Sequence, residues 1–172
     1  VLTRQLRYST RSEKSLDVTL SVNGIPIATV ELKNAMTGQT VENARLQYKQ
    51  DRDPRETIFE FKKRTLVHFA VDTDAVLMTT RLAGSATNFL PFNKGDDGGA
   101  GNPADSHGRS YRTAYLWEEV LARDSLLDLL ARVHAEVWGD DIVALDGFAH
   151  GERLAAGRLG LRGGDEALAR HD

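Results

Sequence analysis

Three residues in the first quarter of the chain, Asp17, Glu31 and Lys33, have the types and spacing that hydrolysis of a phosphodiester bond requires. An acidic residue on one strand-like segment, followed by Glu-x-Lys on the next, is the arrangement of a magnesium-dependent nuclease centre. Magnesium takes oxygen ligands and keeps several waters, so one or two carboxylates and a substrate phosphate suffice to hold it. The metal would activate a water, and the lysine would stabilise charge that develops on the phosphate. The three residues therefore predict metal-assisted hydrolysis.

Two carboxylates can share a metal ion only if they point to the same side of their sheet. Asn23-Gly24 joins the two alternating segments, and a two-residue loop would send Glu31 to the side opposite Asp17. One extra residue in the connection sets Asp17 opposite Glu31 and matches polar with polar residues. We therefore predict a three-residue connection with a glycine bulge at Gly24, or an equivalent bulge nearby, whereas a strict two-residue turn would count against the metal site. The predicted pairs are Val22 with Pro26, Leu20 with Ala28, Thr19 with Thr29, Val18 with Val30 and Leu16 with Leu32.

Composition limits the classes of protein to consider. The 172 residues are 41% hydrophobic and 27% charged, which predicts one soluble domain. The chain has no cysteine, and its apolar runs are too short to cross a bilayer, so we expect a cytoplasmic protein without disulfides, zinc-thiolate sites or a membrane partner. Its net charge of −3 means that contact with DNA must rely on a local basic patch and on metal.

The remaining pattern is that of a sheet with a helix inserted between its strands. Apolar residues recur at helical spacing over 41–50 after a possible cap at Thr40, and again over 113–138, where Asp124 and Ser125 predict a break between two helices. His68 lies within an apolar strand and is most simply a core histidine. We also expect a weakly patterned start over 1–14, a short helix over 57–64, a hairpin over 66–80 and a long loop over 88–110.

Several segments, in this order, resemble the amino-terminal nuclease domain of the restriction (R, HsdR) subunit of type I restriction-modification enzymes. The resemblance implies an α/β fold of the PD-(D/E)xK restriction-endonuclease-like kind, with a central mixed sheet flanked by helices, over residues 1–138. Residues 139–172 lack an apolar pattern, and we expect them to form a poorly ordered tail. The resemblance extends from about Leu16 to Arg132 through VNGIPIATVELKN, QYKQDRDP, LVHFAVDTDAVLMTT, FLPFNKG with GNP, and TAYLWEEVLARDSLLDLLAR.

The resemblance also assigns roles to residues. It implies that Asp17 and Glu31 bind Mg²⁺, that the main-chain carbonyl of Leu32 is a third ligand, and that Lys33 is the catalytic lysine. Family members carry a Gln-x-x-x-Tyr signature on the helix after the catalytic strand, where it contacts DNA and orients the site. Here a tyrosine stands at the matching place but an alanine replaces the glutamine, so the DNA-binding or orienting role is carried over to Gln47 and Tyr48.

The function implied is Mg²⁺-dependent hydrolysis of phosphodiester bonds in unmodified foreign DNA. The partners implied are double-stranded DNA and, in the complete enzyme, methylation and specificity subunits. No G-x-x-x-x-G-K-[ST] phosphate loop occurs in the sequence, so ATP is expected only for the motor of the full-length protein. Two alternatives stay open: an inactive remnant or fragment of the domain that binds DNA or partner subunits, and a free-standing PD-(D/E)xK DNA repair nuclease.

Overall fold

The structure of the chain is a computed structural model that describes residues 1–104, 108 and 110–137. The predicted tail, 139–172, lies outside the described residues, as does residue 138 at the end of the predicted domain. Within the described part, no helix is both long enough and apolar enough to span a membrane.

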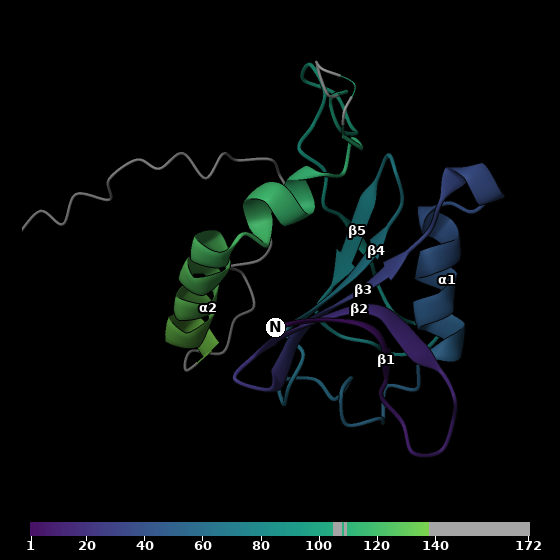
Figure 1. Ribbon diagram of the computed structural model, residues 1–172, viewed down its shortest axis with the longest axis vertical. Helices are drawn as coiled ribbons and strands as arrows, with labels where there is room; N and C mark the ends of the chain where they lie inside the picture. The colour runs from purple at the N-terminus through teal and green to yellow at the C-terminus, as the bar shows by residue number, and fades with distance from the viewer. Residues whose placement is uncertain (105–107, 109, 138–172) are drawn as a thin grey trace, which may run out of the picture.

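One mixed sheet organises the described residues (Figure 1). Its strands lie in chain order, and each neighbouring pair is antiparallel except β3 and β4, which are parallel. A parallel pair needs a crossover connection, and the inserted helix α1 (Val41–Asp51) provides it. The predicted α/β class and mixed sheet are therefore confirmed. The strands are β1 (Leu2–Arg7), β2 (Ser15–Val22), β3 (Ile25–Leu32), β4 (Val67–Val71), β5 (Val76–Thr79) and β6 (Leu90–Pro91).

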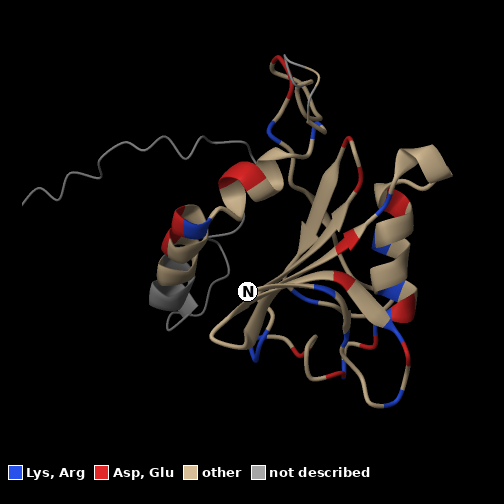
Figure 2. Ribbon diagram, in the orientation of Figure 1, with Lys and Arg blue, Asp and Glu red and all other residues tan. Residues whose placement is uncertain are grey.

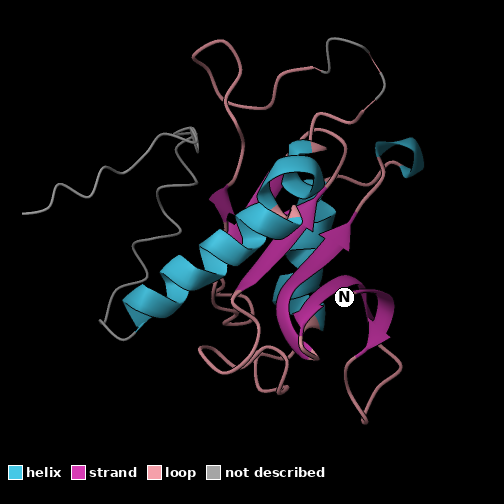
Figure 3. Cartoon of the chain, turned by 60° about the vertical axis from the view of Figure 1, so that its left-hand side comes forward, coloured by secondary structure: helices cyan, strands magenta, loops and turns pink. Residues whose placement is uncertain are grey.

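Helical elements lie on both faces of the sheet (Figures 1 and 3). Helix α1 covers one face, and the π-helical turn η2 (Leu116–Val120) covers the other, followed by α2 (Arg123–Val137). A short 3₁₀ turn, η1 (Ala35–Thr37), connects β3 to α1. The predicted break between the last two helices falls at residues 121–122, slightly before the predicted Asp124 and Ser125.

Each face of the sheet has its own hydrophobic core. On the α1 face, the buried cluster joins Ala44 and Tyr48 of the helix to Leu16 and Ala70 of the strands. On the opposite face, Leu116 of η2 packs with strand residues such as Val30 and Phe69. Alternate residues of the inner strands therefore enter different cores, as expected for a sheet covered on both sides.

The start of α1 is fixed by side chains as well as by packing. Asn43 accepts a hydrogen bond from the backbone N–H of Thr40 at 2.8 Å, and Asp72, in the β4–β5 turn, accepts the Val41 N–H at 2.7 Å. These acceptors satisfy N–H groups that a helix terminus leaves without partners, and Asp72 fastens the helix to the sheet. Along α1, basic and acidic residues mix, as the blue and red segments of Figure 2 show.

The β2–β3 hairpin has a different turn from the predicted one, but most of the predicted strand pairs farther from the turn are present. Val22 pairs with Ile25 across a two-residue turn, in which Asn23 and Gly24 both have positive φ (50° and 79°), the backbone of a type I′ turn. The three-residue connection and the Val22–Pro26 pair were therefore wrong, because asparagine and glycine both tolerate this backbone.

The extra residue lies instead within β3. Ser21 pairs with Pro26 and Leu20 with Ala28, so Ile27 is the additional residue of a bulge. Beyond it, the predicted pairs Leu20–Ala28, Thr19–Thr29 and Val18–Val30 are all present. The equivalent nearby bulge that we predicted is thus confirmed, and it removes the objection that a two-residue turn raised against the site.

Two other local expectations need correction. Residues 1–14 contain the strand β1, which we had not predicted. Its Leu2 is 59% exposed, so the strand lacks the apolar alternation that marks a buried strand. Residues 57–64 form successive turns and not the short helix we expected, with Phe59 N–H bonded to Glu56 O and Lys62 at a positive φ of 62°. Burial of Ile58 and Phe59 in the α1-face core holds this segment. Tertiary packing decides its shape.

Candidate active site

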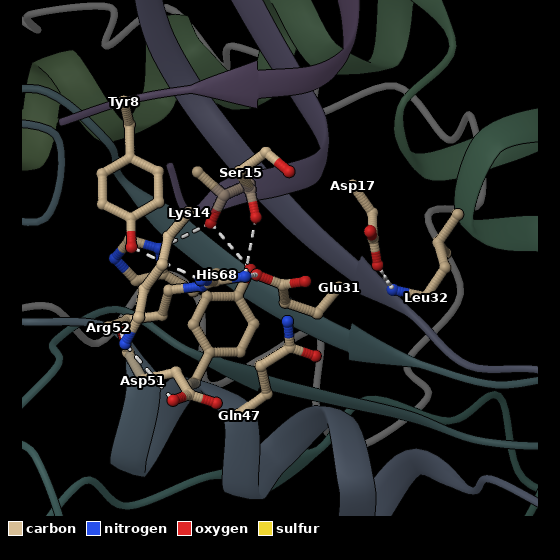
Figure 4. A network of polar contacts seen from close by, with 12 residues as sticks. Tyr8, Lys14, Ser15, Asp17, Glu31, Leu32, Gln47, Asp51, Arg52 and His68 are labelled. Carbon is tan, nitrogen blue, oxygen red and sulfur yellow. Dashed lines mark hydrogen bonds and ion pairs between the residues drawn. The ribbon is translucent and has the colours of Figure 1, made fainter. Parts of the chain in front are cut away.

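The site begins where strands β2 and β3 separate. Their ladder ends at Val18–Val30, and Asp17 and Glu31 are the next residues along each strand. Asp17 Oδ2 accepts the Leu32 backbone N–H at 2.8 Å, so a carboxylate takes a place that a backbone carbonyl of β2 would otherwise fill (Figure 4). The predicted Leu16–Leu32 pair is absent, because the β2–β3 register ends at Val18–Val30. The regular ladder therefore does not continue past Asp17.

The carbonyl of Leu32 faces β2. Lys33 donates its N–H to Val71 O of β4 at 2.8 Å, whereas Leu32 directs its N–H toward Asp17 on the β2 side. In an extended strand the N–H and C=O of one residue point to the same side. The Leu32 carbonyl is therefore on the Asp17 side, where the third predicted metal ligand is needed.

Glu31 is fully buried and is paired with Arg52, which follows the end of α1 (Figure 4). Arg52 contacts a single oxygen of the carboxylate, Oε1, with Nε at 2.7 Å and with a terminal nitrogen at 2.5 Å. The other oxygen, Oε2, is buried and has no hydrogen-bond partner. An unsatisfied buried carboxylate oxygen is costly, and a bound cation is one of the few groups that would satisfy it.

The electrostatic state of Glu31 reflects this burial. Loss of solvent raises the pKa of Glu31 to about 7, although Arg52 lowers that pKa and the neighbouring Asp17 raises it further. The effect of Asp17 places the two carboxyl groups close enough to interact. Two interacting carboxylates, one with an oxygen that no donor satisfies, are suitable ligands for a divalent cation.

Lys33 and Gln47 are brought together across the β3–α1 connection. Lys33 Nζ donates to Gln47 Oε1 at 2.5 Å, and both side chains are partly exposed. Gln47 thus holds the ammonium next to the strand that carries Glu31. The helix signature is altered in sequence, but Gln47 of the same helix contacts the predicted catalytic lysine.

Tyr48 lies elsewhere, in the core. It is fully buried, its hydroxyl is 2.8 Å from Thr29 Oγ1, and that oxygen is 2.7 Å from His68 Nδ1. Burial lowers the pKa of His68 to about 3 and raises that of Tyr48, so both side chains are neutral. Direct contact of Tyr48 with DNA is incompatible with this burial, and that part of the predicted role needs correction. His68 is the core histidine that we predicted.

Two residues of the site were missed in the sequence. Nothing in the sequence singled out Arg52, and Gln5 falls in the stretch 1–14 that we expected to be weakly patterned. Gln5 Nε2 donates to Asp17 Oδ1 at 3.1 Å, and Ser15 Oγ donates to Gln5 Oε1 at 2.8 Å. Gln5 also has a positive φ of 50° within a strand, which is uncommon for a residue other than glycine. Neither residue carried a local signal, because both act through contacts between distant segments.

A cavity of about 500 Å³ lies on the opposite face of the sheet. Most of its wall is apolar, including Val18, Leu20, Val30 and Leu116. Its acidic residue, Asp72, is occupied by the backbone N–H groups of residues 41, 74 and 75. The cavity shares Leu32 and Lys33 with the site, but neither Asp17 nor Glu31 lines it, so we assign the chemistry to the region of the two carboxylates.

The residues present fit a magnesium ion. In the described residues no group of three or more His, Cys, Asp or Glu side chains is arranged to hold a metal. The ligands that the site can offer are the carboxylates of Asp17 and Glu31 and the Leu32 carbonyl. This number is sufficient for Mg²⁺, which retains several waters. The free Oε2 atom of Glu31 is the structural observation that favours the fit.

Titration of Glu31 predicts how the metal-free protein responds to pH. Its pKa is raised from 4.5 in the unfolded chain to about 7 in the folded chain. The folded state therefore binds the proton more tightly, and this stabilisation is complete below pH 4.5 and is lost as pH rises through 7. Relative to a Glu31→Gln variant, the wild type should lose roughly 3 kcal/mol of unfolding free energy between pH 4.5 and 8. Urea unfolding of both proteins across this range measures it, and a constant difference would contradict it.

Comparison with known proteins gives one match. The family model described as "Type I restriction enzyme R protein N terminus (HSDR_N)" matches residues 1–87, which include β1 to β5 and all the site residues discussed above. No curated protein and no solved structure matches the chain.

Proposed function

Because the chain belongs to the family of type I restriction enzyme R protein N termini, we propose that it hydrolyses DNA phosphodiester bonds in a Mg²⁺-dependent reaction. The family indicates a nuclease domain of a restriction enzyme. The observation that carries the metal-dependent step is the buried, unpartnered Oε2 atom of Glu31 beside Asp17. We propose that this end of the β2–β3 ladder holds the metal and receives the scissile phosphate.

Each residue has a separate task in this proposal. Asp17, Glu31 and the Leu32 carbonyl hold Mg²⁺, which when bound supplies an activated water and stabilises negative charge on the phosphate. Lys33 places a fixed positive charge beside the phosphate, where charge increases during the reaction. Gln47 holds the Lys33 ammonium in position through the 2.5 Å hydrogen bond.

The proposed substrate and partners follow from the family. The substrate is unmodified double-stranded DNA, and the methylation and specificity subunits of the complete enzyme would choose where the domain acts. The partly exposed basic side chains of α1, Arg45 and Lys49, offer charge for contact with the DNA backbone, although Arg45 also pairs with Glu42. In a complete enzyme, ATP would serve a motor and not this site.

A metal-binding and cleavage experiment tests the proposal. Supercoiled plasmid should be cut by the wild type with Mg²⁺, spared after chelation, and cut again when Mg²⁺ is restored. Asp17→Asn keeps the size of the side chain but replaces a charged ligand with a neutral one. Mn²⁺ affinity should therefore fall at least about tenfold, since even groups that only hydrogen-bond to metal ligands typically cost that much when mutated.

The same experiment separates the proposal from an inactive remnant of the domain. If the domain is an inactive remnant, calorimetry will detect no Mn²⁺ uptake that depends on Asp17 or Glu31, and the plasmid will behave the same with and without chelator. Asp51→Asn is the matched control, because its carboxylate pairs with Lys14 on the surface. That variant should bind Mn²⁺ like the wild type.

A further inference from the structure

Arg52 is anchored by more groups than the carboxylate it contacts. One terminal nitrogen donates to the backbone carbonyl of Ser15 at 2.8 Å, and the other lies 3.4 Å from the Tyr8 hydroxyl. The guanidinium carbon also lies 5.5 Å from the centre of the Tyr8 ring, within the range of a cation–π contact. The Arg52 side chain is 3% exposed. Its position is therefore fixed by β2 and by Tyr8 as well as by Glu31.

This anchoring makes the two oxygens of Glu31 unequal. Oε1 receives both close contacts from Arg52, at 2.7 Å and 2.5 Å, whereas Oε2 receives none. A cation that enters the site therefore meets Oε2, which has no partner, and Oε1, which already contacts two nitrogens of the Arg52 guanidinium. Arg52 need not leave for the cation to bind, because the buried Oε2 has no hydrogen-bond partner that the cation would have to displace.

We propose that Arg52 is a specificity-determining residue of the metal site, which restricts Glu31 to binding through one oxygen and so favours Mg²⁺ over Ca²⁺. Magnesium requires six ligands in near-ideal octahedral geometry, and a carboxylate serves it well through a single oxygen. Calcium takes six to eight ligands and readily accepts both oxygens of one carboxylate. Because Arg52 already contacts Oε1, Ca²⁺ cannot bind both oxygens of the Glu31 carboxylate. This inference rests on the proposed function, since it assumes that Glu31 is a metal ligand.

Competition between metals tests the inference. Mn²⁺ bound to the wild type, Arg52→Met and Arg52→Lys is followed by electron paramagnetic resonance while Mg²⁺ or Ca²⁺ alone displaces it. In Arg52→Met, Oε1 becomes available as an added ligand, and the ratio of the Ca²⁺ to the Mg²⁺ dissociation constant should fall roughly tenfold, the scale on which ligand number tunes calcium affinity. Arg52→Lys offers one nitrogen in place of a planar fork, so its ratio should fall by less.

The ratio separates this role from a structural one. A variant that merely loosens the site weakens both metals alike, and an unchanged ratio in the folded variants would overturn the inference. If Arg52→Met does not fold, as circular dichroism would reveal, Arg52→Lys decides, because it retains the charge. Arg55→Met is the matched control, since Arg55 is exposed and pairs with Asp53, and its ratio should equal that of the wild type. Failure of the wild type to bind Mn²⁺ would instead refute the proposed function.

Discussion

Replacing Lys33 with methionine should lower the rate of Mg²⁺-dependent DNA cleavage by about 10²–10³-fold, the usual loss when one preorganised charge-stabilising group is removed. Methionine keeps most of the length and apolar stem of lysine but lacks the ammonium. Lys33 contributes a charge to the proposed site and is not a metal ligand, so Mn²⁺ affinity should change little. Plasmid cleavage under single-turnover conditions measures the first effect, and calorimetry measures the second.

The pairing of Lys33 with Gln47 sharpens this expectation. Gln47→Ala removes the 2.5 Å hydrogen bond but leaves the ammonium, so its loss of cleavage should be smaller than that of Lys33→Met. Lys63→Met serves as the control, because Lys63 is exposed and pairs with Glu60. Cleavage by Lys33→Met at the wild-type rate would contradict the role of Lys33. A parallel loss of Mn²⁺ binding would show that the substitution damages the site as a whole.

The sequence was sufficient for the parts of the site that depend on local pattern. Alternation along two strands predicted that Asp17 and Glu31 would share a face if one residue were added, and the bulge at Ile27 adds it. The helical spacing of apolar residues over 41–50 predicted a helix with one buried face, and Ala44 and Tyr48 form that face of α1. These features follow from periodicities of a single element, which the sequence displays directly.

The sequence was insufficient where contacts join distant segments. The bulge falls at Ile27, directly after Pro26, and the turn residues did not reveal this location. Arg52 is separated from Glu31 by a whole helix, and its charge resembled that of its exposed neighbours such as Arg55. Only the fold distinguishes a buried arginine that orients a carboxylate from one that is solvated.

The free energy of unfolding should show how strongly the buried pair of Glu31 and Arg52 is coupled. At pH 8 the wild-type Glu31, with a pKa of about 7, is ionised beside Arg52. Because Arg52 lowers this pKa, Arg52→Met forces the buried Glu31 either to carry an unpaired charge or to take up a proton, and both cost free energy. We expect this variant to lose about 3–5 kcal/mol, as is typical when one member of a buried ion pair is removed. Urea unfolding in the absence of metal measures the loss.

The double variant Glu31→Leu/Arg52→Met provides the decisive comparison. Two apolar side chains of similar volume need no compensating charge, so the double variant should regain most of the stability that Arg52→Met loses. It should nevertheless bind no Mn²⁺, because the carboxylate has gone. If the double variant is as unstable as the sum of the single variants, the two side chains are not coupled, and the pairing at Oε1 is not what fixes Glu31. Recovery of stability without recovery of metal binding would indicate that the buried pair is kept for its chemistry, since an apolar pair would serve the fold equally well.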